Sequence, residues 1–271
     1  MTNNSSLVLL GALLALSGSS IRAQDAPDLV TDRPDQTESA VVVPPGAFQA
    51  ELGVAYAREE QAGIRVESIE VPGTLLRYGL SERVELRLAW PGIIEQETRT
   101  PAGRGRQRGA GDPELGLKAS FLSAERGDGL NLALLVHATL PVGDETLGSP
   151  RADPSLRLLG AHELSDRVGL GWNVGYEAGS FEDDAGDRHT LGRFVYTGAL
   201  GLAIASRWGA FVELFGDLPA SDPESVAHSL DAGVTFLLTP RLQLDFAAGG
   251  GLTEAAEDWF TGAGLSFRLP N

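Results

Sequence analysis

The feature that most constrains this chain is an alternation of apolar and polar side chains with a period of two residues. In the stretch RLQLDFAAG, Leu242, Leu244 and Phe246 fall on one face of an extended chain, while Gln243 and Asp245 fall on the other. A helix would scatter these residues around its axis, whereas a β-strand sorts them onto two faces. The pattern therefore predicts a half-buried strand.

About twelve segments show this alternation, and no long amphipathic helix separates them, which argues against a parallel α/β fold. We expect an all-β protein, a transmembrane antiparallel up-and-down β-barrel of about 12 strands, because outer-membrane barrels have even strand numbers. Pro72 interrupts the second segment and predicts a β-bulge, since proline cannot donate to a strand ladder. The expected strands lie near residues 46–58, 64–79, 83–93, 113–123, 129–140, 154–163, 167–180, 190–205, 208–218, 226–238, 241–252 and 258–269.

A small polar motif recurs between these segments. The chain reads GLSERVEL at 79–86, ELSDRVGL at 163–170 and LLTPRLQL at 237–244, with a looser echo, ASRWGAF, at 205–211. Ser, Asp and Glu favour turns, and each Arg can reach lipid headgroups or water at the membrane edge. These tight connections alternate with longer polar ones. The motif therefore predicts the short periplasmic turns of an outer-membrane barrel.

The first 23 residues have the shape of a secretory signal peptide. The apolar run LVLLGALLAL is too short to cross a bilayer as a helix, and small polar residues follow it up to a cleavage position at Ala23. The leading MTNNSS lacks the usual Lys or Arg, and a buried helix of a soluble protein is the alternative. We expect a signal peptide (1–23), a periplasmic or lumen-inserted segment (24–45) and an outer-membrane β-barrel (46–269).

The two faces of the expected strands differ in chemistry. Apolar and aromatic residues share one parity, which would face lipid, and charged residues share the other, which would face the lumen. A soluble β-sandwich would reverse these environments, and periodicity alone does not separate the two folds. The signal peptide and the alternating loop lengths favour the membrane. The expected lumen-lining residues, which would set selectivity, are Arg77, Glu85, Arg87, Lys118, His137, Arg157, Arg193, Glu213, Asp231 and Asp245.

Composition argues against several classes of function. The formal net charge of −16 is unsuited to binding nucleic acid, and the absence of cysteine excludes disulfides, thiol catalysis and thiolate zinc sites. No histidine has a metal-ligand neighbour at helical or hairpin spacing, and the acidic stretch FEDDAGD lacks the terminal Glu of a calcium loop. We therefore expect neither a metal nor a cofactor. The basic stretch GRGRQRG (103–109) is expected to be a solvated flexible loop, with binding of an anion such as lipopolysaccharide phosphate as the alternative.

Several blocks carry a family resemblance. The chain reads TDRPDQTES at 31–39, VPPGAFQAELGVAY at 43–56, LLRYGLSERVELRL at 75–88, GAGDPELGLK at 109–118 and DWFTGAGLSFR at 258–268. These blocks resemble the outer-membrane proteins of the MetA-pathway of phenol degradation family, over nearly the whole mature chain. The resemblance implies an outer-membrane transporter barrel and gives a weak hint of aromatic solutes. The chain departs from outer-membrane barrels in ending FRLPN, where an aromatic residue is common.

The polar segment before the first strand has two interpretations. It is either a periplasmic tether or an element that inserts into the lumen, where its charges would pair with Arg77, Arg87 or Arg193. The rigid VPPG that follows would aim it. This N-terminal motif comprises Asp32, Arg33, Pro34, Asp35, Thr37, Glu38 and Ser39.

The expected function is diffusion of small solutes, aromatic or hydrophobic compounds among them, through the barrel, without a catalytic step. One alternative is an outer-membrane lipid hydrolase, which needs a nucleophile and a base within hydrogen-bond reach. His137 offers little for this, because its same-face neighbour is Thr139 rather than Ser. A second alternative is a structural barrel with a plugged lumen. The expected partners are outer-membrane lipids, a small-molecule solute and the barrel assembly machinery.

Overall fold

The computed structural model describes residues 29–123, 129–183, 185–221 and 225–269, and the predicted signal peptide lies outside this range. Among these residues, no helix is both long enough and apolar enough to cross a membrane. The strands are β1 (Phe48–Gln61), β2 (Ile64–Ser81), β3 (Val84–Trp90), β4 (Ile93–Thr100), β5 (Gly103–Ala110), β6 (Glu114–Leu122), β7 (Leu130–Thr139), β8 (Asp153–Ser165), β9 (Val168–Glu182), β10 (Arg188–Ala205), β11 (Trp208–Pro219), β12 (Ala227–Thr239), β13 (Leu242–Gly251) and β14 (Trp259–Arg268).

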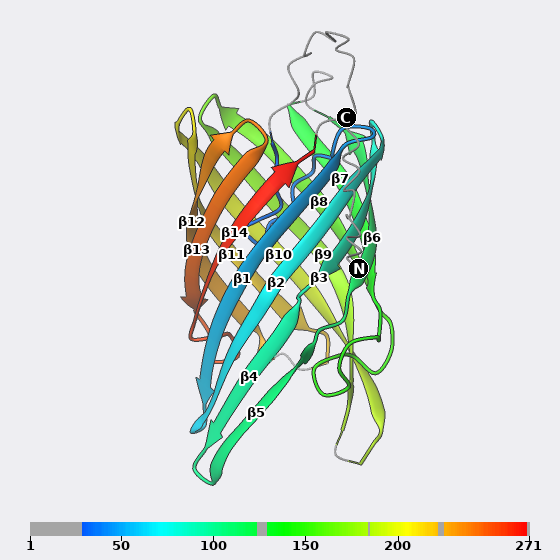
Figure 1. Cartoon of the computed structure of the whole chain (residues 1–271), viewed down its shortest axis with the longest axis vertical. Helices are drawn as coiled ribbons and strands as arrows, with labels where there is room; N and C mark the ends of the chain where they lie inside the picture. The colour runs from blue at the N-terminus through cyan, green and yellow to red at the C-terminus, as the bar shows by residue number, and fades with distance from the viewer. Residues whose placement is uncertain (1–28, 124–128, 184, 222–224, 270–271) are drawn as a thin grey trace, which may run out of the picture.

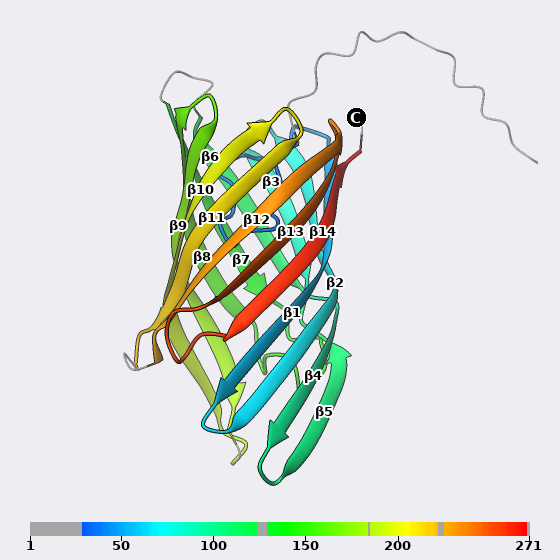
Figure 2. The ribbon, with the colours of Figure 1, turned by 90° about the vertical axis from the view of Figure 1, so that its left-hand side faces the viewer.

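The strands form one sheet that closes on itself (Figures 1 and 2). All of them except β4 and β5 belong to a closed barrel of twelve antiparallel strands, in which β1 pairs with both β14 and β2. Closure leaves no free edge in the barrel wall. The predicted barrel is therefore confirmed, and each of its strands lies within a few residues of the segment expected from the sequence.

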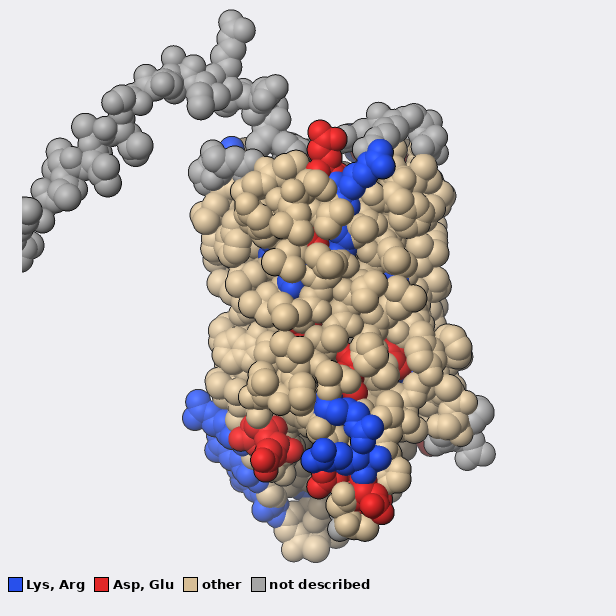
Figure 3. Space-filling view, turned by 90° about the vertical axis from the view of Figure 1, so that its right-hand side faces the viewer, with Lys and Arg blue, Asp and Glu red and all other residues tan. Residues whose placement is uncertain are grey.

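The barrel is apolar outside and charged inside. Arg77, Glu85, Lys118 and Glu213 are fully buried in the interior, whereas Leu244 is 41% exposed on the outer surface. A soluble β-sandwich would bury the apolar face instead, so that alternative is excluded. Figure 3 shows a broad, largely uncharged band, with most of the visible Lys, Arg, Asp and Glu at the lower end and a few at the upper end. Such an outer band suits contact with lipid.

The recurring sequence motif forms the tight turns at one end of the barrel. In ELSDRVGL, the backbone N–H of Arg167 donates to the hydroxyl of Ser165 at 3.4 Å, a local bond that favours a turn. The looser echo carries Ala205 at the position of this hydroxyl. The same bond recurs from Arg83 to Ser81 and from Arg241 to Thr239.

Each turn arginine also extends the sheet through its backbone. A β-bulge shifts the register between Glu163 and Ser165, and the carbonyl of Arg167 accepts a hydrogen bond from Ala203 N–H of β10 at 2.8 Å. The bulge and the arginine carbonyl together keep the ladder paired up to the barrel rim. The equivalent acceptor and donor pairs are Arg83 and Ser120, Arg207 and Leu237, and Arg241 and Arg268.

The predicted bulge at Pro72 is confirmed. Gly73 pairs with Gly53 and Glu70 pairs with Ala55, so Val71 and Pro72 together lie opposite a single residue of β1. Directly paired residues share a face. Glu70 and Gly73 therefore point to the same side although they are three positions apart, and the inward parity of β2 changes across the bulge.

The prediction of a flexible loop at residues 103–109 is wrong, because these residues form most of β5. β2 has 18 residues and β3 only 7, so the far half of β2 lacks β3 as a partner and pairs with β4 instead. β4 then pairs with β5 along its whole length. The composition of GRGRQRG resembles that of a loop because Gly is depleted in strands. Its strand conformation depends on the long-range partner.

Candidate functional site

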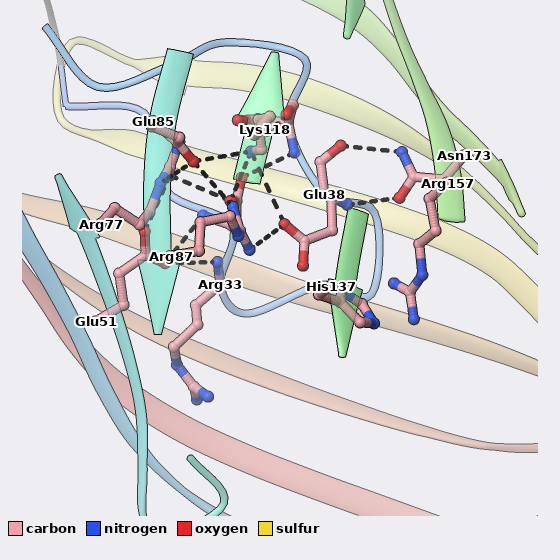
Figure 4. A network of polar contacts seen from close by, with 12 residues as sticks. Arg33, Glu38, Glu51, Arg77, Glu85, Arg87, Lys118, His137, Arg157 and Asn173 are labelled. Atoms are coloured by element: carbon pink, nitrogen blue, oxygen red, sulfur yellow. Dashed lines mark hydrogen bonds and ion pairs between the residues drawn. The ribbon is translucent and has the colours of Figure 1, made fainter. Parts of the chain in front are cut away.

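The residues that precede β1 run through the barrel interior. This inserted segment, residues 29–47, buries Leu29, Ala40, Val43 and Ala47. Its polar groups contact strands on opposite sides of the lumen, from β2, β3 and β6 to β9 and β11 (Figure 4). The segment therefore crosses the lumen.

Asp32 is the centre of a buried charge cluster. Its carboxylate lies 2.9 Å from Lys118 Nζ and 3.3 Å from Arg77 Nη1, and it also accepts a hydrogen bond from Arg87. The other oxygen of this carboxylate accepts the backbone N–H of Ser39 at 2.8 Å. Because the three cations belong to β6, β2 and β3, one side chain joins three strands to the inserted segment.

Two glutamates of the barrel wall complete the cluster. Arg77 donates to Glu85 at 3.0 Å through Nε and to Glu51 at 3.1 Å through Nη1. Glu51 also accepts the backbone N–H groups of Asp32 at 2.9 Å and Arg33 at 3.0 Å. Removing one partner from a buried ion pair costs about 3–5 kcal/mol, because a charge is left uncompensated. The cluster therefore favours a single position of the inserted segment.

The opposite wall binds the segment through neutral and acidic groups. Glu38 N–H donates to Asn173 Oδ1 at 2.8 Å, and Asn173 Nδ2 returns a hydrogen bond to the carbonyl of Glu38 at 3.0 Å. The carboxylate of Glu213 accepts the backbone N–H of Gln36 at 2.7 Å and the hydroxyl of Thr37. These bonds fix the backbone of the segment to β9 and β11.

A cavity of about 460 Å³, which we call the vestibule, lies beside the inserted segment. Arg33, Pro34 and Gln36 of the segment line it, as do residues 255–257 of the β13–β14 connection. An adjoining cavity of about 140 Å³ shares Gln36 with the vestibule. The remaining lining residues of the vestibule are Ala55, Tyr56, Ala57, Ser68, Glu70, Phe215, Asp217, Ala227, Ser229, Asp231, Ala247, Phe260, Thr261 and Gly262.

The N-terminal motif lies within the inserted segment. Arg33 reaches Asp245 of β13 at 3.5 Å, and Glu38 pairs with Arg87. Asp35 is half-buried, and among the described residues it forms no ion pair. The other residues of the motif are Asp32, Pro34, Thr37 and Ser39.

The ten residues expected to line the lumen separate into two groups. Six contact the inserted segment through ion pairs or hydrogen bonds: Arg77, Glu85, Arg87, Lys118, Glu213 and Asp245. The others are Arg157, which pairs with Glu177, Arg193, which lies 3.7 Å from Asp217, His137, whose Nε2 lies 3.8 Å from Glu114, and Asp231 in the vestibule wall. A role of either group in selectivity stays a prediction.

Sequence reasoning missed part of this arrangement. Parity predicts an inward position for Glu51 and Asn173, but it did not indicate that both hold the segment. Phe215 and Phe260 line the vestibule, although aromatic side chains were expected only on the outer face. Phe215 lies two positions from Glu213, so its parity could have indicated an inward position.

The carboxylate of Asp183, in the connection between β9 and β10, forms local contacts. Asp183 Oδ1 accepts the backbone N–H groups of Ala185 at 3.0 Å and Asp187 at 2.9 Å, and Oδ2 lies 2.8 Å from Nε2 of His189. This hydrogen bond with His189 is the main reason that the pKa of Asp183 is lowered. Within the described part of the chain, no group of three or more His, Asp and Glu residues is placed to hold a metal ion.

Comparisons with known proteins agree with this geometry. The family model described as "Putative MetA-pathway of phenol degradation" matches residues 31–269. The fold is similar to the COG4313 outer membrane channel from Pseudomonas putida F1, with a TM-score of 0.65 and 14% identity over 85% of this chain and 98% of that one. It is also similar to the NanC porin (TM-score 0.51, 10% identity, 82% and 100% covered) and the translocator domain of autotransporter NalP from Neisseria meningitidis (TM-score 0.52, 10% identity, 82% and 88% covered). No curated protein matches the chain by sequence.

Proposed function

The chain belongs to the MetA-pathway of phenol degradation family, and we propose that it is an outer-membrane channel through which small solutes diffuse. The observation that carries this proposal is the vestibule, a cavity of about 460 Å³ inside a closed barrel, beside a segment that crosses the lumen. A space of this size accommodates a small organic molecule. The fold that the chain shares with an outer membrane channel agrees with this function.

The inserted segment would form the constriction of the channel. Its ion pairs with Arg77, Arg87 and Lys118 hold it across the lumen, so a solute leaving the vestibule must pass beside it or displace it. The charges along this route would set selectivity. The family's name refers to phenol degradation, which places aromatic compounds among the candidate solutes.

The outer surface supports a position in the outer membrane. The tight turns would face the periplasm, and the longer connections with the β4–β5 hairpin would face outward. β5 carries Arg104, Arg106 and Arg108 at alternate positions, on the face shared with the exposed Ile69 of β2. These arginines would meet lipid phosphates of the outer leaflet. Insertion of such a barrel would require the barrel assembly machinery.

The alternative of a lipid hydrolase lacks comparable support. His137 has a carboxylate of Glu114 at 3.8 Å, and Thr139 follows on the same face of β7. A structural barrel with a permanently closed lumen is the stronger alternative. The buried charge cluster around Asp32 favours it, because such a cluster resists displacement of the inserted segment.

Conductance of the purified barrel in a planar bilayer tests the proposal, alongside a variant that lacks residues 24–40. Discrete conductance steps from the complete mature chain would support a channel that conducts with its segment present. Steps from the deletion variant alone would favour a barrel that the segment keeps closed. Silence from both forms, together with release of fatty acid from phospholipid vesicles, would support the lipid hydrolase instead.

A further inference from the structure

The vestibule carries more acidic than basic groups. Glu70, Asp217, Asp231 and Glu257 line it, and Arg33 is its one lining cation among the described residues. The guanidinium of Arg33 already lies 3.5 Å from Asp245, which does not itself line the cavity. The negative charge in the vestibule wall is therefore largely uncompensated.

Asp231 is the most deeply buried of the four acidic residues that line the vestibule. Its side chain is almost completely buried, with 3% of the residue exposed, and within the described residues its Oδ1 accepts no hydrogen bond. It lies directly opposite Glu213 in the β11–β12 ladder and interacts with that side chain, which is itself acidic and also binds the inserted segment through Gln36 and Thr37. A buried carboxylate of this kind is costly without a paired cation.

Glu70 is half-buried and Glu257 is exposed, and both also lack a cationic partner among the described residues. In the part of the chain that the structure describes, neither forms an ion pair with Lys, Arg or His, whereas Asp217 lies 3.7 Å from Arg193. The two glutamates come from β2 and from the β13–β14 connection, on different sides of the same cavity. A cation in the vestibule would thus meet carboxylates from three elements.

The vestibule wall also has an aromatic and aliphatic part, beside the polar side chains of Gln36, Ser68, Ser229 and Thr261. Phe215 and Phe260 meet edge to face with ring centroids 5.7 Å apart, and both line the cavity. Aromatic faces attract cations, and ammonium groups are often bound by aromatic rings. The aliphatic part of the lining is supplied by Ala55, Ala57, Ala227, Ala247, Ala255 and Ala256.

We infer that the vestibule binds small organic cations, in which an ammonium group is joined to an apolar or aromatic body. The ammonium group would lie among Asp231, Glu70 and Glu257, and the apolar body would pack against Phe215 and Phe260. This inference rests on the proposed function in naming the solute class, but binding can be measured without any passage through the barrel.

The test is calorimetric titration of the folded mature chain in detergent with benzyltrimethylammonium, benzyl alcohol and benzoate. These probes share one ring and differ in charge. We expect the cation to bind at least about tenfold more tightly than the other two, a difference of about 1.4 kcal/mol. Equal affinity for the cation and benzoate would overturn the inference. So would preference for the neutral alcohol, which would assign the cavity to uncharged aromatic solutes.

Substitutions distinguish an effect of the residues that line the vestibule from an effect of the protein's net charge. Asp231→Asn should weaken binding of the cation about tenfold, because it removes a charge that attracts the ammonium group, and Phe260→Leu about threefold, because it removes an aromatic face that packs against the apolar body. Glu257→Gln, in a connection rather than a strand, serves as a second variant if Asp231→Asn fails to fold. Asp166→Asn changes the net charge equally in an exposed turn and should leave the affinity unchanged. Unchanged affinity in folded Asp231→Asn or Glu257→Gln would also overturn the inference.

The outcomes for this inference and for the proposed function are distinct. Loss of cation binding together with normal conductance would overturn only the assignment of the solute class. Normal cation binding without conductance in any form of the barrel would overturn only the channel.

Discussion

Lys118 Nζ lies 2.9 Å from Oδ2 of Asp32, although the two residues are 86 positions apart in the sequence. The first is on β6 in the barrel wall and the second is in the inserted segment. Both are almost completely shielded from solvent. This contact, with the two arginine contacts of the same carboxylate, joins the inserted segment to the barrel wall.

Neutralising Asp32 should release the inserted segment. Asp32→Asn leaves Arg77, Arg87 and Lys118 without their shared carboxylate, at a cost of about 3–5 kcal/mol for a broken buried pair. We expect faster proteolytic cleavage between residues 32 and 39 in the folded barrel, and a larger conductance. Asp35→Asn is the matched control, because it removes the same charge three positions away without breaking an ion pair among the described residues. Equal cleavage of both variants and the parent would show that the cluster does not hold the segment.

Arginine substitutions should distinguish the two faces of the barrel. Leu244 is exposed on the outer face of β13, and an arginine on the lipid-facing surface costs up to about 2–4 kcal/mol at the bilayer midplane and less toward either interface, so Leu244→Arg should reduce the folded fraction in lipid vesicles. Thr235 of β12 is half-buried and pairs with Asp245, so it lies on the inner face at nearly the same depth. Thr235→Arg should be tolerated. Similar damage from both substitutions, measured by the mobility of unheated protein in a gel, would contradict the assignment of faces.

The two ends of the barrel should differ in accessibility on intact cells. Ala102 lies in the exposed turn of the β4–β5 hairpin, and Ser165 is the last residue of β8, directly before the tight turn to β9 at the other end. With short turns in the periplasm, Ala102→Cys should react with a membrane-impermeant maleimide and Ser165→Cys should react only after the cells are opened. Labelling of Ser165→Cys alone would invert the topology.

Most strands and tight turns of the barrel could be predicted because short stretches of sequence determine them. Alternation in stretches such as the one around Leu244 marks strands, and Ser-x-Arg marks tight turns through a bond between neighbouring residues. The β4–β5 hairpin could not be predicted in this way, because the length of β2 beyond β3 provides its partner. The propensity of Gly and Arg gives no sign of that pairing.

The site was predicted only in part. Parity identified Arg77, Arg87 and Lys118 as inward residues, but it could not show that one carboxylate, Asp32, would contact all three. Such a meeting depends on where a segment without periodicity comes to lie. The inward positions of Phe215 and Phe260 were missed because aromatic residues were assigned as a class to the membrane interface.

The outer face of the β4–β5 hairpin should bind lipopolysaccharide phosphate. The side chains of Arg104 and Arg106 are 60% and 58% exposed, although each also pairs with a glutamate of β4. On the sheet face formed by β1, β2, β4 and β5, arginines outnumber glutamates: Arg58, Arg65, Arg99, Arg104, Arg106 and Arg108 against Glu60, Glu67, Glu95 and Glu97. A basic residue near an anionic membrane surface contributes about 1 kcal/mol.

A triple variant in which Gln replaces Arg104, Arg106 and Arg108 should therefore copurify with less lipopolysaccharide than the parent. Added salt should lower the amount that copurifies with the parent protein, because salt screens exposed charges. The matched control replaces Arg83, Arg167 and Arg241 with Gln, which removes the same charge from the tight turns at the other end. Those turns would face the periplasm, away from the leaflet that holds lipopolysaccharide, so the control should retain the parent's amount. Equal retention by the two triple variants would show that the arginines of the hairpin do not recognise the lipid. Greater loss from the control would place the tight turns, rather than the hairpin, at the outer leaflet.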